Sequence, residues 1–584
     1  MRSEPRFSRI VQEDIFQPRL RYELGLDEAM ALAVRRARLL HRRGLVANSM
    51  WCGGPEADRF AEFVRDLGWI GAYDFALLSV IVDHQIAGNA LLSHGSPAQV
   101  AAHREEIDRF DTVYAFAATE LGRGSDLRRL GTEAHYSHTD RTLTLRTPDD
   151  AATKCWIGNS LFSAEVAMTL ARLIVDGVDE GHHWIRVPLR EKEGALPYDG
   201  IRIQRADPKG GIVANQTGMI RFEDYRIPAD ALMSSWARIS PEGRYQSDIG
   251  PHERFSRCME TFIQERIFPV AAAAQAVRRA AAIAVRYSTS RTAYRRPLIG
   301  HAHYQERLTP IVARALALRE AMELLIQDAS ADYGTVEGRS RLYGRTSGFK
   351  AAATWQANTA LGQLRELCGG HGFHAFNEIV SMRNDFEINT TFAGDNTILC
   401  YESVRVTARE PRSAPPGPPA ESALCPAERT GVLLAALAHG LLDEWRDTGR
   451  YALCVPHVQA ATAAAVLARW RPSDAHGVEA QLRDLYGIDS VLQLVGPALA
   501  HGLLDQAAVA GLMRERADLC GRLGADPELL LAALDVPEPL LDVPIAHPDY
   551  EARTLDLAAD TYAWGSLPAH DSTPGISPGS AVVR

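Results

Sequence analysis

The sequence has few cysteines and no long uncharged apolar stretch. Only 8 of its 584 residues are Cys, and none form a CxxC pair, so a disulfide framework is excluded. No run approaches 18 uncharged apolar residues, and the N-terminus MRSEPRFSRIVQED lacks an apolar core. We therefore expect neither a membrane-spanning helix nor a secretory signal. Because the C-terminal SAVVR is also not a peroxisomal tripeptide, the prediction is a soluble cytoplasmic protein.

An excess of positive charge is also lacking. Lys and Arg total 63 against 73 Asp and Glu, which gives a formal net charge of -10. Nucleic acids and anionic membranes are therefore not expected as partners. The composition is otherwise that of a globular protein, with 46% hydrophobic and 23% charged residues. At roughly 150 residues per domain, the length predicts about three or four domains.

Several common catalytic motifs are missing. The chain has no Gly-rich loop followed by Lys-Ser or Lys-Thr, no GxSxG and no HExxH. The histidine pairs at His182 and His183 and at His371 and His374 are better explained as ordinary hydrogen-bonded side chains. No metal site is predicted.

The apolar periodicity changes along the chain and predicts a mainly α protein with a central β domain. The β domain rests on short alternating runs, such as those at 141–146, 183–188 and 219–222. A Pro-rich stretch predicts a linker, and a Ser/Gly/Pro-rich tail predicts disorder. The predicted order is a helical domain (1–110), a β domain (111–250), a helical bundle (251–408), the linker (409–427), a C-terminal helical domain (428–565) and the tail (566–584).

Two helices of the first domain are distinct in the sequence. The segment from Glu28 to Arg43 combines an apolar stripe with a basic face that includes Arg35 and Arg36. That face is predicted to be solvated, with a phosphate contact as the alternative. The segment from Phe75 to Leu92 is apolar on all sides and is predicted to be buried.

Four local patterns carry more information together than singly. They are Thr119-Glu-Leu-Gly-Arg-Gly-Ser-Asp126, Lys154-Cys-Trp-Ile-Gly-Asn159, Arg291-Thr-Ala-Tyr294 with Tyr304-Gln305, and Cys368-Gly-Gly-His-Gly-Phe373 with Phe392-Ala-Gly-Asp-Asn-Thr397. In this order the chain resembles the acyl-CoA dehydrogenase and acyl-CoA oxidase flavoprotein superfamily over about residues 50–405. The extra C-terminal helical domain resembles the oxidase branch. The resemblance implies a helical domain, a β-barrel-like domain and a helical bundle, with FAD between the last two.

The resemblance also implies positions for the cofactor contacts. Thr119 and Ser125 would contribute to the flavin and thioester side of the cleft, or alternatively only cap a turn. Trp156 and Gly158 would lie at the isoalloxazine. Arg291 and Gln305 would reach the pyrophosphate and adenosine part of FAD. Three glycines would approach a FAD in the neighbouring subunit, which implies at least a homodimer, and a threonine completes the set: Gly369, Gly370, Gly372 and Thr397.

The base expected in this superfamily is absent from its usual place. Most members carry Glu in a Phe-Glu-Gly or Tyr-Glu-Gly triplet, where this chain has Phe392-Ala393-Gly394. Activity is therefore lost, or Asp395 acts as the base, or the base lies elsewhere. The isovaleryl and long-chain dehydrogenases place Glu directly before an Arg on a facing helix, and Glu265-Arg266 matches that pattern. Glu265 is the predicted catalytic base.

The residues around Glu265 agree with this interpretation. On a helical period Glu265 shares a face with Phe262, Phe268 and Ala272, so burial is expected to raise its pKa. Pro269 removes the amide that would bond the Glu265 carbonyl, which predicts a kink within that turn. The alternative is a structural glutamate paired with an arginine.

Gly158 marks a second departure from the dehydrogenases, which commonly carry Thr at this position. A missing side chain beside the flavin is expected to remove a hydroxyl contact and leave room for dioxygen. The alternative is a glycine that merely serves a turn.

The predicted function is an FAD-dependent acyl thioester oxidase of lipid and fatty acid metabolism. It forms a 2-enoyl thioester by α-proton abstraction and β-hydride transfer, and oxygen reoxidises the flavin to give hydrogen peroxide. The expected partners are an acyl-CoA or acyl-carrier-protein thioester, molecular oxygen and a second copy of the chain. The alternatives are a dehydrogenase with another electron acceptor, a flavin-dependent monooxygenase and a non-catalytic acyl-binding subunit.

Overall fold

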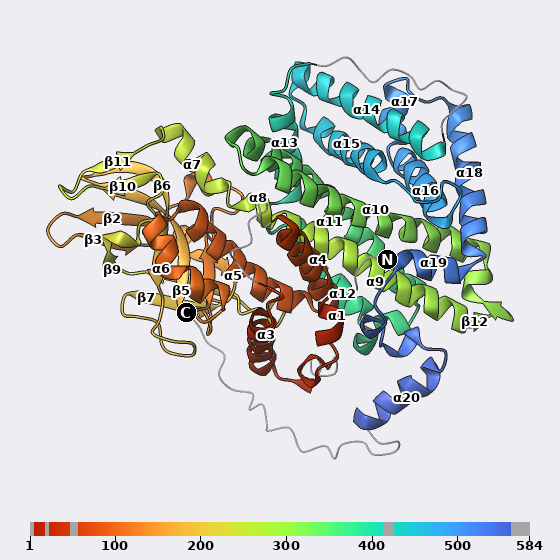
Figure 1. Cartoon of the computed structure of the whole chain (residues 1–584), viewed down its shortest axis with the longest axis horizontal. Coiled ribbons are helices and arrows are strands. Elements are labelled where there is room, and N and C mark those ends of the chain that lie inside the picture. The colour runs from red at the N-terminus through yellow and green to blue at the C-terminus, as the bar shows by residue number, and fades with distance from the viewer. Residues whose placement is uncertain (1–4, 18–22, 47–56, 413–424, 562–584) are drawn as a thin grey trace, which may run out of the picture.

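The computed structural model describes residues 5–17, 23–46, 57–412 and 425–561. Helices, strands, long helices and further helices follow one another along the chain, which is the predicted order (Figure 1). The strands lie at one end of the molecule, beside the N-terminal helices, and the long helices form the other end. The predicted mainly α fold with a central β domain is confirmed.

The N-terminal part consists of helices. Their bounds are α1 (Phe7–Ile10), η1 (Asp14–Phe16), α3 (Leu26–Arg42), α4 (Ala57–Tyr73), α5 (Phe75–His94) and α6 (Pro97–Asp108). Asp74 caps α5 by accepting a hydrogen bond from the Leu77 amide (3.1 Å). As predicted, α5 is buried along nearly its whole length.

One prediction about this part is wrong. Arg36 was expected on a solvated basic face of α3, but its side chain is only 2% exposed. It forms an ion pair with Asp74 (3.1 Å) and donates to the Ile15 carbonyl (2.7 Å). A buried guanidinium with these partners is structural and is not available to a phosphate.

The β domain contains two main sheets. The larger joins β1 (Tyr114–Ala117), β2 (Glu133–Ser137), β3 (Thr142–Arg146), β5 (Val166–Val175), β6 (Val178–Pro188) and β9 (Tyr225–Pro228). Its path is β1-β5-β2-β3-β9, and β6 pairs antiparallel with β5. The smaller has the order β4 (Lys154–Ile157), β8 (Gly218–Phe222), β7 (Ile201–Arg205). The three alternating runs of the sequence lie in β3, β6 and β8.

The β region also contains shorter elements, and one hairpin lies outside it. The region adds η3 (Leu127–Arg129), β10 (Ala237–Ile239) and β11 (Tyr245–Ser247). The hairpin of β12 (Thr292–Ala293) and β13 (Arg296–Pro297) lies between two helices of the bundle.

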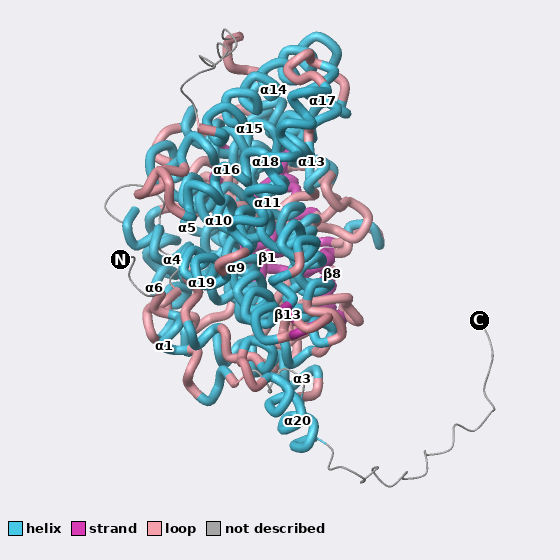
Figure 2. The backbone as a smooth tube through the Cα atoms, turned by 90° about the vertical axis from the view of Figure 1, so that its right-hand side faces the viewer, coloured by secondary structure: helices cyan, strands magenta, loops and turns pink. Residues whose placement is uncertain are grey.

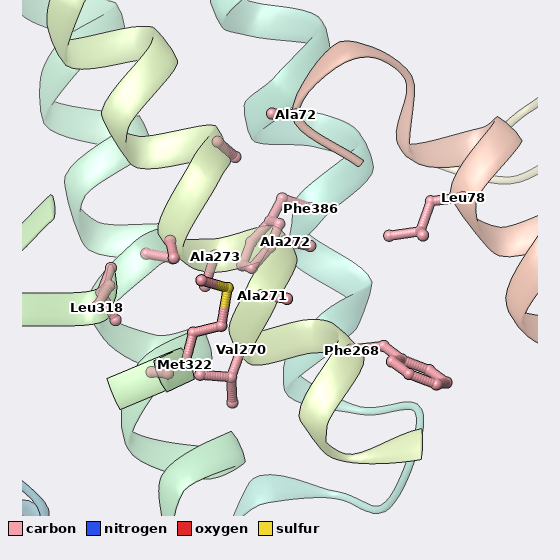
Figure 3. Close-up of a cluster of buried hydrophobic side chains, with 14 of the residues drawn as sticks. Ala72, Leu78, Phe268, Val270, Ala271, Ala272, Ala273, Leu318, Met322 and Phe386 are labelled. Atoms are coloured by element: carbon pink, nitrogen blue, oxygen red, sulfur yellow. The ribbon is translucent and has the colours of Figure 1, made fainter. Parts of the chain in front are cut away.

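Helices of 4 to 32 residues follow the β domain. They are α7 (Pro251–Met259), α8 (Phe262–Glu265), α9 (Ile267–Ser290), α10 (Ala302–Asp332), α11 (Val336–Leu367), α12 (Ile379–Phe386) and α13 (Asn396–Thr407). The Ala-rich α9 packs against α4, α10 and α11, because small side chains let helix backbones approach closely. Figure 3 shows its Val270–Ala273 turn beside Leu318 and Met322. The predicted kink is confirmed, since the helix breaks at Arg266 between α8 and α9.

The C-terminal helices pack on the bundle. They are α14 (Pro426–Thr448), α15 (Cys454–Arg469), α16 (Val478–Gln493), α17 (Val495–Ala500), α18 (Gln506–Gly524), α19 (Pro527–Leu534) and α20 (Tyr550–Thr561). Helices α14 and α17 lie at one end of the molecule and α20 at the other (Figure 2). Most of the predicted linker, at 413–424, and the whole predicted tail at 566–584 lie outside the described residues.

By length and composition alone, three helical stretches of the described chain could cross a membrane. They are 75–94, 251–290 and 451–469. Their most apolar windows are 94%, 100% and 44% buried inside the fold. For the first two, the apolar composition serves the core of the protein.

Candidate active site

A large cavity brings several predicted residues together. It has a volume of about 1450 Å³ and lies among α5, the β domain, α8 and the segment that leads into α13. Five predicted site residues line it: Thr119, Ser125, Trp156, Gly158 and Glu265. Ala393 and Asp395 line it as well. The fold therefore joins the first two patterns, the end of the fourth, and the candidate base.

Glu265 is the last residue of α8, at the break before α9. It is 9% exposed, and its Oε2 is buried without a hydrogen-bond partner among the described residues. Burial raises the pKa of Glu265 to about 8, the Arg266 guanidinium opposes the rise, and the Asp83 carboxyl adds to it. A carboxyl in this state is a candidate general base, because its proton affinity lies near neutral pH.

Arg266 does not pair with Glu265 but anchors the turn that carries Ala393. Its Nε donates to the Ala393 carbonyl (3.3 Å) and its Nη1 to the Ser347 hydroxyl (2.9 Å). Ala393 has a φ of 58°, in the left-handed region that non-glycine residues rarely adopt. The Lys350 ammonium also holds this turn, by donating to the Gly394 carbonyl (2.7 Å). These contacts keep the Ala393 turn on the wall of the cavity that Glu265 also lines.

Asp395 has a structural task. Its Oδ1 accepts hydrogen bonds from the amides of Thr397 (2.9 Å) and Ile398 (3.4 Å), and so caps the N-terminus of α13. A carboxylate used in this way is a less suitable base than the unpaired Glu265.

Trp156 reaches the cavity because β4 is irregular. The pairing of β4 with β8 shifts between Lys154 and Ile157, and Trp156 has a φ of 65°. This bulge turns the indole out of the sheet, where it is 61% exposed and lines the cavity. A large apolar ring left open in a cavity wall is suited to stack against a planar ligand.

Gly158 also lines the cavity, but the space beside it is filled. A Cβ at this position would overlap Oδ2 and Cγ of Asp83 and would lie 3.0 Å from its Oδ1. The expectation that the missing side chain leaves room for dioxygen is therefore wrong, because the Asp83 carboxyl occupies that room.

The loop that carries Thr119 and Ser125 rests on a buried ion pair that sequence reasoning missed. The Lys154 ammonium lies 3.2 Å from the Glu120 carboxylate, and both side chains are inaccessible to solvent. Glu120 also accepts hydrogen bonds from the amides of Gly131 (2.7 Å) and Thr132 (2.9 Å). Lys154 and Glu120 belong to the first two patterns, so their pairing fixes those patterns relative to each other.

The remaining predicted cofactor contacts do not line this cavity. Arg291, Gly369 and Gly370 line a second cavity of about 590 Å³. Gln305 packs against α18, since a Cβ on Gly524 would lie 2.6 Å from its Cγ. Thr397 is exposed in the first turn of α13.

Two of the predicted glycines have local roles at the end of α11. Gly369 has a φ of 57°, as expected of a helix C-terminus. Gly372 donates its amide to the Cys368 carbonyl (3.1 Å), and a Cβ there would overlap the Arg365 carbonyl. Within one chain, the predicted cofactor contacts are thus divided between two cavities and the surface.

Comparison with known proteins agrees with the fold and the motifs. Residues 259–408 match the acyl-CoA oxidase C-alpha1 domain, and residues 115–225 match the acyl-CoA dehydrogenase middle domain. Acyl-coenzyme A oxidase 2 of Arabidopsis thaliana is 30% identical over 59% of this chain and 52% of its own length. Acyl-coenzyme A oxidase 3 of the same plant is 26% identical over 94% of this chain and 86% of its own length.

Both relatives are named peroxisomal, and so are others from mammals, which points to peroxisomes. The cytoplasmic location predicted from the sequence is therefore wrong. Neither the N-terminal segment MRSEPRFSRIVQED nor the C-terminal SAVVR indicates this location.

Among solved structures, acyl-CoA oxidase 1 of Yarrowia lipolytica superposes with a TM-score of 0.85 at 20% identity, over 97% of this chain and 91% of that chain. The chain spans about half the length of some curated relatives and most of the length of others. The four ordered patterns agree with the two domain matches, and the predicted resemblance to the acyl-CoA dehydrogenase and acyl-CoA oxidase superfamily, and to its oxidase branch, is confirmed.

Proposed function

We propose that the protein is an FAD-dependent acyl-CoA oxidase of fatty acid metabolism. The observation that carries the proposal is the buried, unpaired carboxyl of Glu265 on the wall of the large cavity. In this activity Glu265 takes the proton α to the thioester, and a 2-enoyl thioester is released. Bound FAD supplies the acceptor for the β hydride, and oxygen restores it with formation of hydrogen peroxide.

The cavity suits a flavin and an acyl thioester together. Its volume of about 1450 Å³ exceeds that of ordinary small-ligand sites, which hold a single molecule. The open Trp156 ring offers a stacking surface, and Phe116, Phe262 and Phe392 add apolar wall. Solved acyl-CoA oxidases of Caenorhabditis elegans contain FAD, in one case together with an ascaroside-CoA, which supports the same cofactor here.

Glu265 is suited to the chemistry by its surroundings. Its raised pKa means that the carboxylate formed near neutral pH is a strong acceptor for a weakly acidic α proton. Nearby, Arg266 and Lys350 hold the Ala393 turn, so that a small side chain stands where most of the superfamily has its glutamate. The gain of Glu265 and the loss at position 393 are therefore complementary.

We further propose that the active form is a homodimer. The division of the predicted FAD contacts between two cavities supports this, since Arg291 and Gly370 of one copy would complete a cofactor site on the other. The CoA phosphates would lie toward the arginines at the rim of the large cavity, which include Arg128, Arg383 and Arg409.

Flavin absorbance without oxygen tests the proposal. Purified protein, the Glu265→Gln variant and a Glu62→Gln control on the exposed face of α4 are mixed with straight and branched acyl-CoAs. Bleaching in the wild type and the control, but not in Glu265→Gln, is expected. Admission of air should then restore the colour and form hydrogen peroxide.

The other outcomes separate the remaining candidates. Bleaching that air does not reverse identifies a dehydrogenase. Equal bleaching in Glu265→Gln moves the base to another residue, with an Asp395→Asn variant as the next test. No bleaching with any acyl-CoA contradicts the proposed activity and leaves a carrier-protein substrate, a monooxygenase or a non-catalytic subunit.

A further inference from the structure

Asp83 is an unusual residue within α5. It is the single Asp, Glu, Lys or Arg in a helix of 20 residues that is otherwise apolar or neutral. Its neighbours on the helix are core residues, yet Asp83 lines the large cavity together with Glu265. A charge placed in a buried helix is costly unless its surroundings use it. The catalytic scheme above uses Asp83 only through its charge, which adds to the rise in the pKa of Glu265.

The position of Asp83 is closely controlled by the β domain. The Asn159 side chain donates to the Val80 carbonyl (2.9 Å), which ties the end of β4 to the turn of α5 that precedes Asp83. The Asn215 side chain donates to Oδ2 of Asp83 (2.8 Å). Among the described residues no hydrogen bond reaches Oδ1, so this oxygen remains available to a ligand in the cavity.

The Asp83 carboxyl occupies the space that a side chain at position 158 would need. The backbone at Gly158 is outside the left-handed region, so local conformation does not require a glycine. A larger residue would nevertheless require the Asp83 carboxyl to move, because its Cβ would overlap that group. The glycine is thus explained by the aspartate and by nothing in its own turn. The carboxyl stands in the space on the cavity wall that a side chain of residue 158 would need.

We propose that the Asp83 carboxyl replaces a side chain at position 158 as the polar group that contacts the flavin on this side. The inference rests on the proposed function, since it takes the large cavity to hold FAD. It assigns to a residue of α5 the flavin contact that the sequence motifs had assigned to position 158, directly after β4.

The chemistry of this contact differs from that of a hydroxyl. Burial raises the pKa of Asp83 to about 6, opposed by the Asn215 hydrogen bond, so the group is a carboxylate at pH 8. A negative charge beside the flavin opposes the addition of electrons to it. Asp83 therefore lowers the flavin midpoint potential and favours return of the electrons to an acceptor.

The first test measures the flavin itself, independently of turnover. The midpoint potential and visible spectrum of bound FAD are recorded at pH 8 for the wild type, Asp83→Asn and an Asp111→Asn control on an exposed loop. Asp83→Asn should make the potential more positive and move the reduction equilibrium about tenfold or more toward reduced flavin. The visible band should shift, and Asp111→Asn should match the wild type.

The second test uses the steric exclusion. Gly158→Ala alone should lower both the melting temperature and the FAD content, because the new Cβ displaces the Asp83 carboxyl. In the double variant Asp83→Ala/Gly158→Ala the melting temperature should recover, since the overlap is removed. Recovery in the double variant would not occur if Gly158→Ala acted only through its own turn.

The outcomes distinguish this inference from the proposed function. A wild-type protein that binds no FAD overturns both. A wild type that binds FAD and is bleached by acyl-CoA, with an unchanged potential and spectrum in Asp83→Asn, overturns only the role of Asp83. A melting temperature that does not recover in the double variant contradicts the exclusion of side chains at position 158.

Discussion

The two cavities of the chain are built in different ways. The large one collects residues from segments far apart in the sequence, and its walls include two carboxyls with raised pKa, Asp83 and Glu265. The small one is formed where the ends of α9, α10 and α11 meet. Its lining holds one carboxyl, Glu366, which is paired, and one buried nitrogen, Nδ1 of His371, without a hydrogen-bond partner among the described residues. There Tyr304 donates to the Leu367 carbonyl (3.0 Å) and Arg307 pairs with Glu366 (2.8 Å).

This difference separates chemistry from recognition. The buried carboxyl of Glu265, with its raised pKa, can accept a proton in a reaction, whereas the ion-paired Glu366 of the small cavity contributes only a polar surface. The large cavity is therefore expected to control the rate of the chemical step. The small cavity is expected to control how tightly the cofactor is held.

The largest effect should come from Glu265→Gln. The amide cannot accept the α proton, so the rate of anaerobic bleaching by acyl-CoA should fall by roughly 10²–10⁴-fold. FAD content and melting temperature should stay near wild type, because the change is isosteric. Stopped-flow absorbance measures the rate, and a Glu265→Gln variant that bleaches at the wild-type rate would exclude Glu265 as the base.

Lys154→Met should mainly reduce stability. It removes the ammonium from a fully buried pair and leaves Glu120 with its backbone hydrogen bonds, the Thr132 hydroxyl and the partly exposed Arg123 as partners. The expected loss in the free energy of unfolding is about 3–5 kcal/mol, measured by urea denaturation. The double variant Lys154→Met/Glu120→Leu should recover part of this loss, and absence of any loss in the single variant would show that the pair is not needed to hold the loop.

The bleaching rate should depend on pH through Glu265. Its pKa is raised to about 8, so the active carboxylate decreases as pH falls below that value. The rate should drop about tenfold per unit between pH 8 and pH 6. The free energy of unfolding should change in the opposite direction and decrease as pH rises. The reason is that Glu265 holds its proton more tightly in the folded protein than in the unfolded chain, where its pKa is near 4.5. Glu265 thus stabilises the fold at low pH, and this contribution is lost between about pH 4.5 and 8.

The pH profile of bleaching is checked by stopped-flow measurements across this range, with the unfolding free energy measured in parallel. A flat profile at saturating acyl-CoA would mean that another group, or a step other than proton transfer, limits the rate.

The smallest effect should come from Arg291→Ala at the small cavity. Loss of a guanidinium from a phosphate contact is expected to weaken FAD binding by about tenfold. The bleaching rate at saturating FAD should not change, since Arg291 does not line the large cavity. Fluorescence titration of the apoprotein gives the affinity, with Arg295→Ala as an exposed neighbour for comparison. A slower chemical step in Arg291→Ala would contradict the assignment of the chemical step to the large cavity and of cofactor binding to the small one.

Much of the fold was open to prediction because its signals are local. The alternating runs at 141–146 and 183–188 became strands, and the apolar segment after Asp74 became a buried helix. The helix breaks at Arg266, directly after Glu265, since Pro269 has no amide to bond the Glu265 carbonyl. The candidate base was also accessible, because an acid and an arginine on an apolar face form a pattern within a few residues.

Other features required the folded chain. Arg36 was predicted on a solvated face, but in the folded chain it pairs with Asp74, which is 38 residues away in the sequence. Asp83 could have been noticed as a lone charge in an apolar helix, but its link to Gly158 could not. The location in the cell was indicated by the names of the relatives and not by a local motif.

The sequence alone determined which segments are helices or strands and the order in which they follow one another, because periodicity acts over one or two turns. It predicted Glu265 as the base through the resemblance of its local pattern. The tertiary structure decided that Gly158 must be small, that Asp395 caps a helix and that the cofactor contacts fall into two cavities. Each of these depends on the distance between atoms from distant segments, and that distance exists only after α5, β4 and the bundle have packed together.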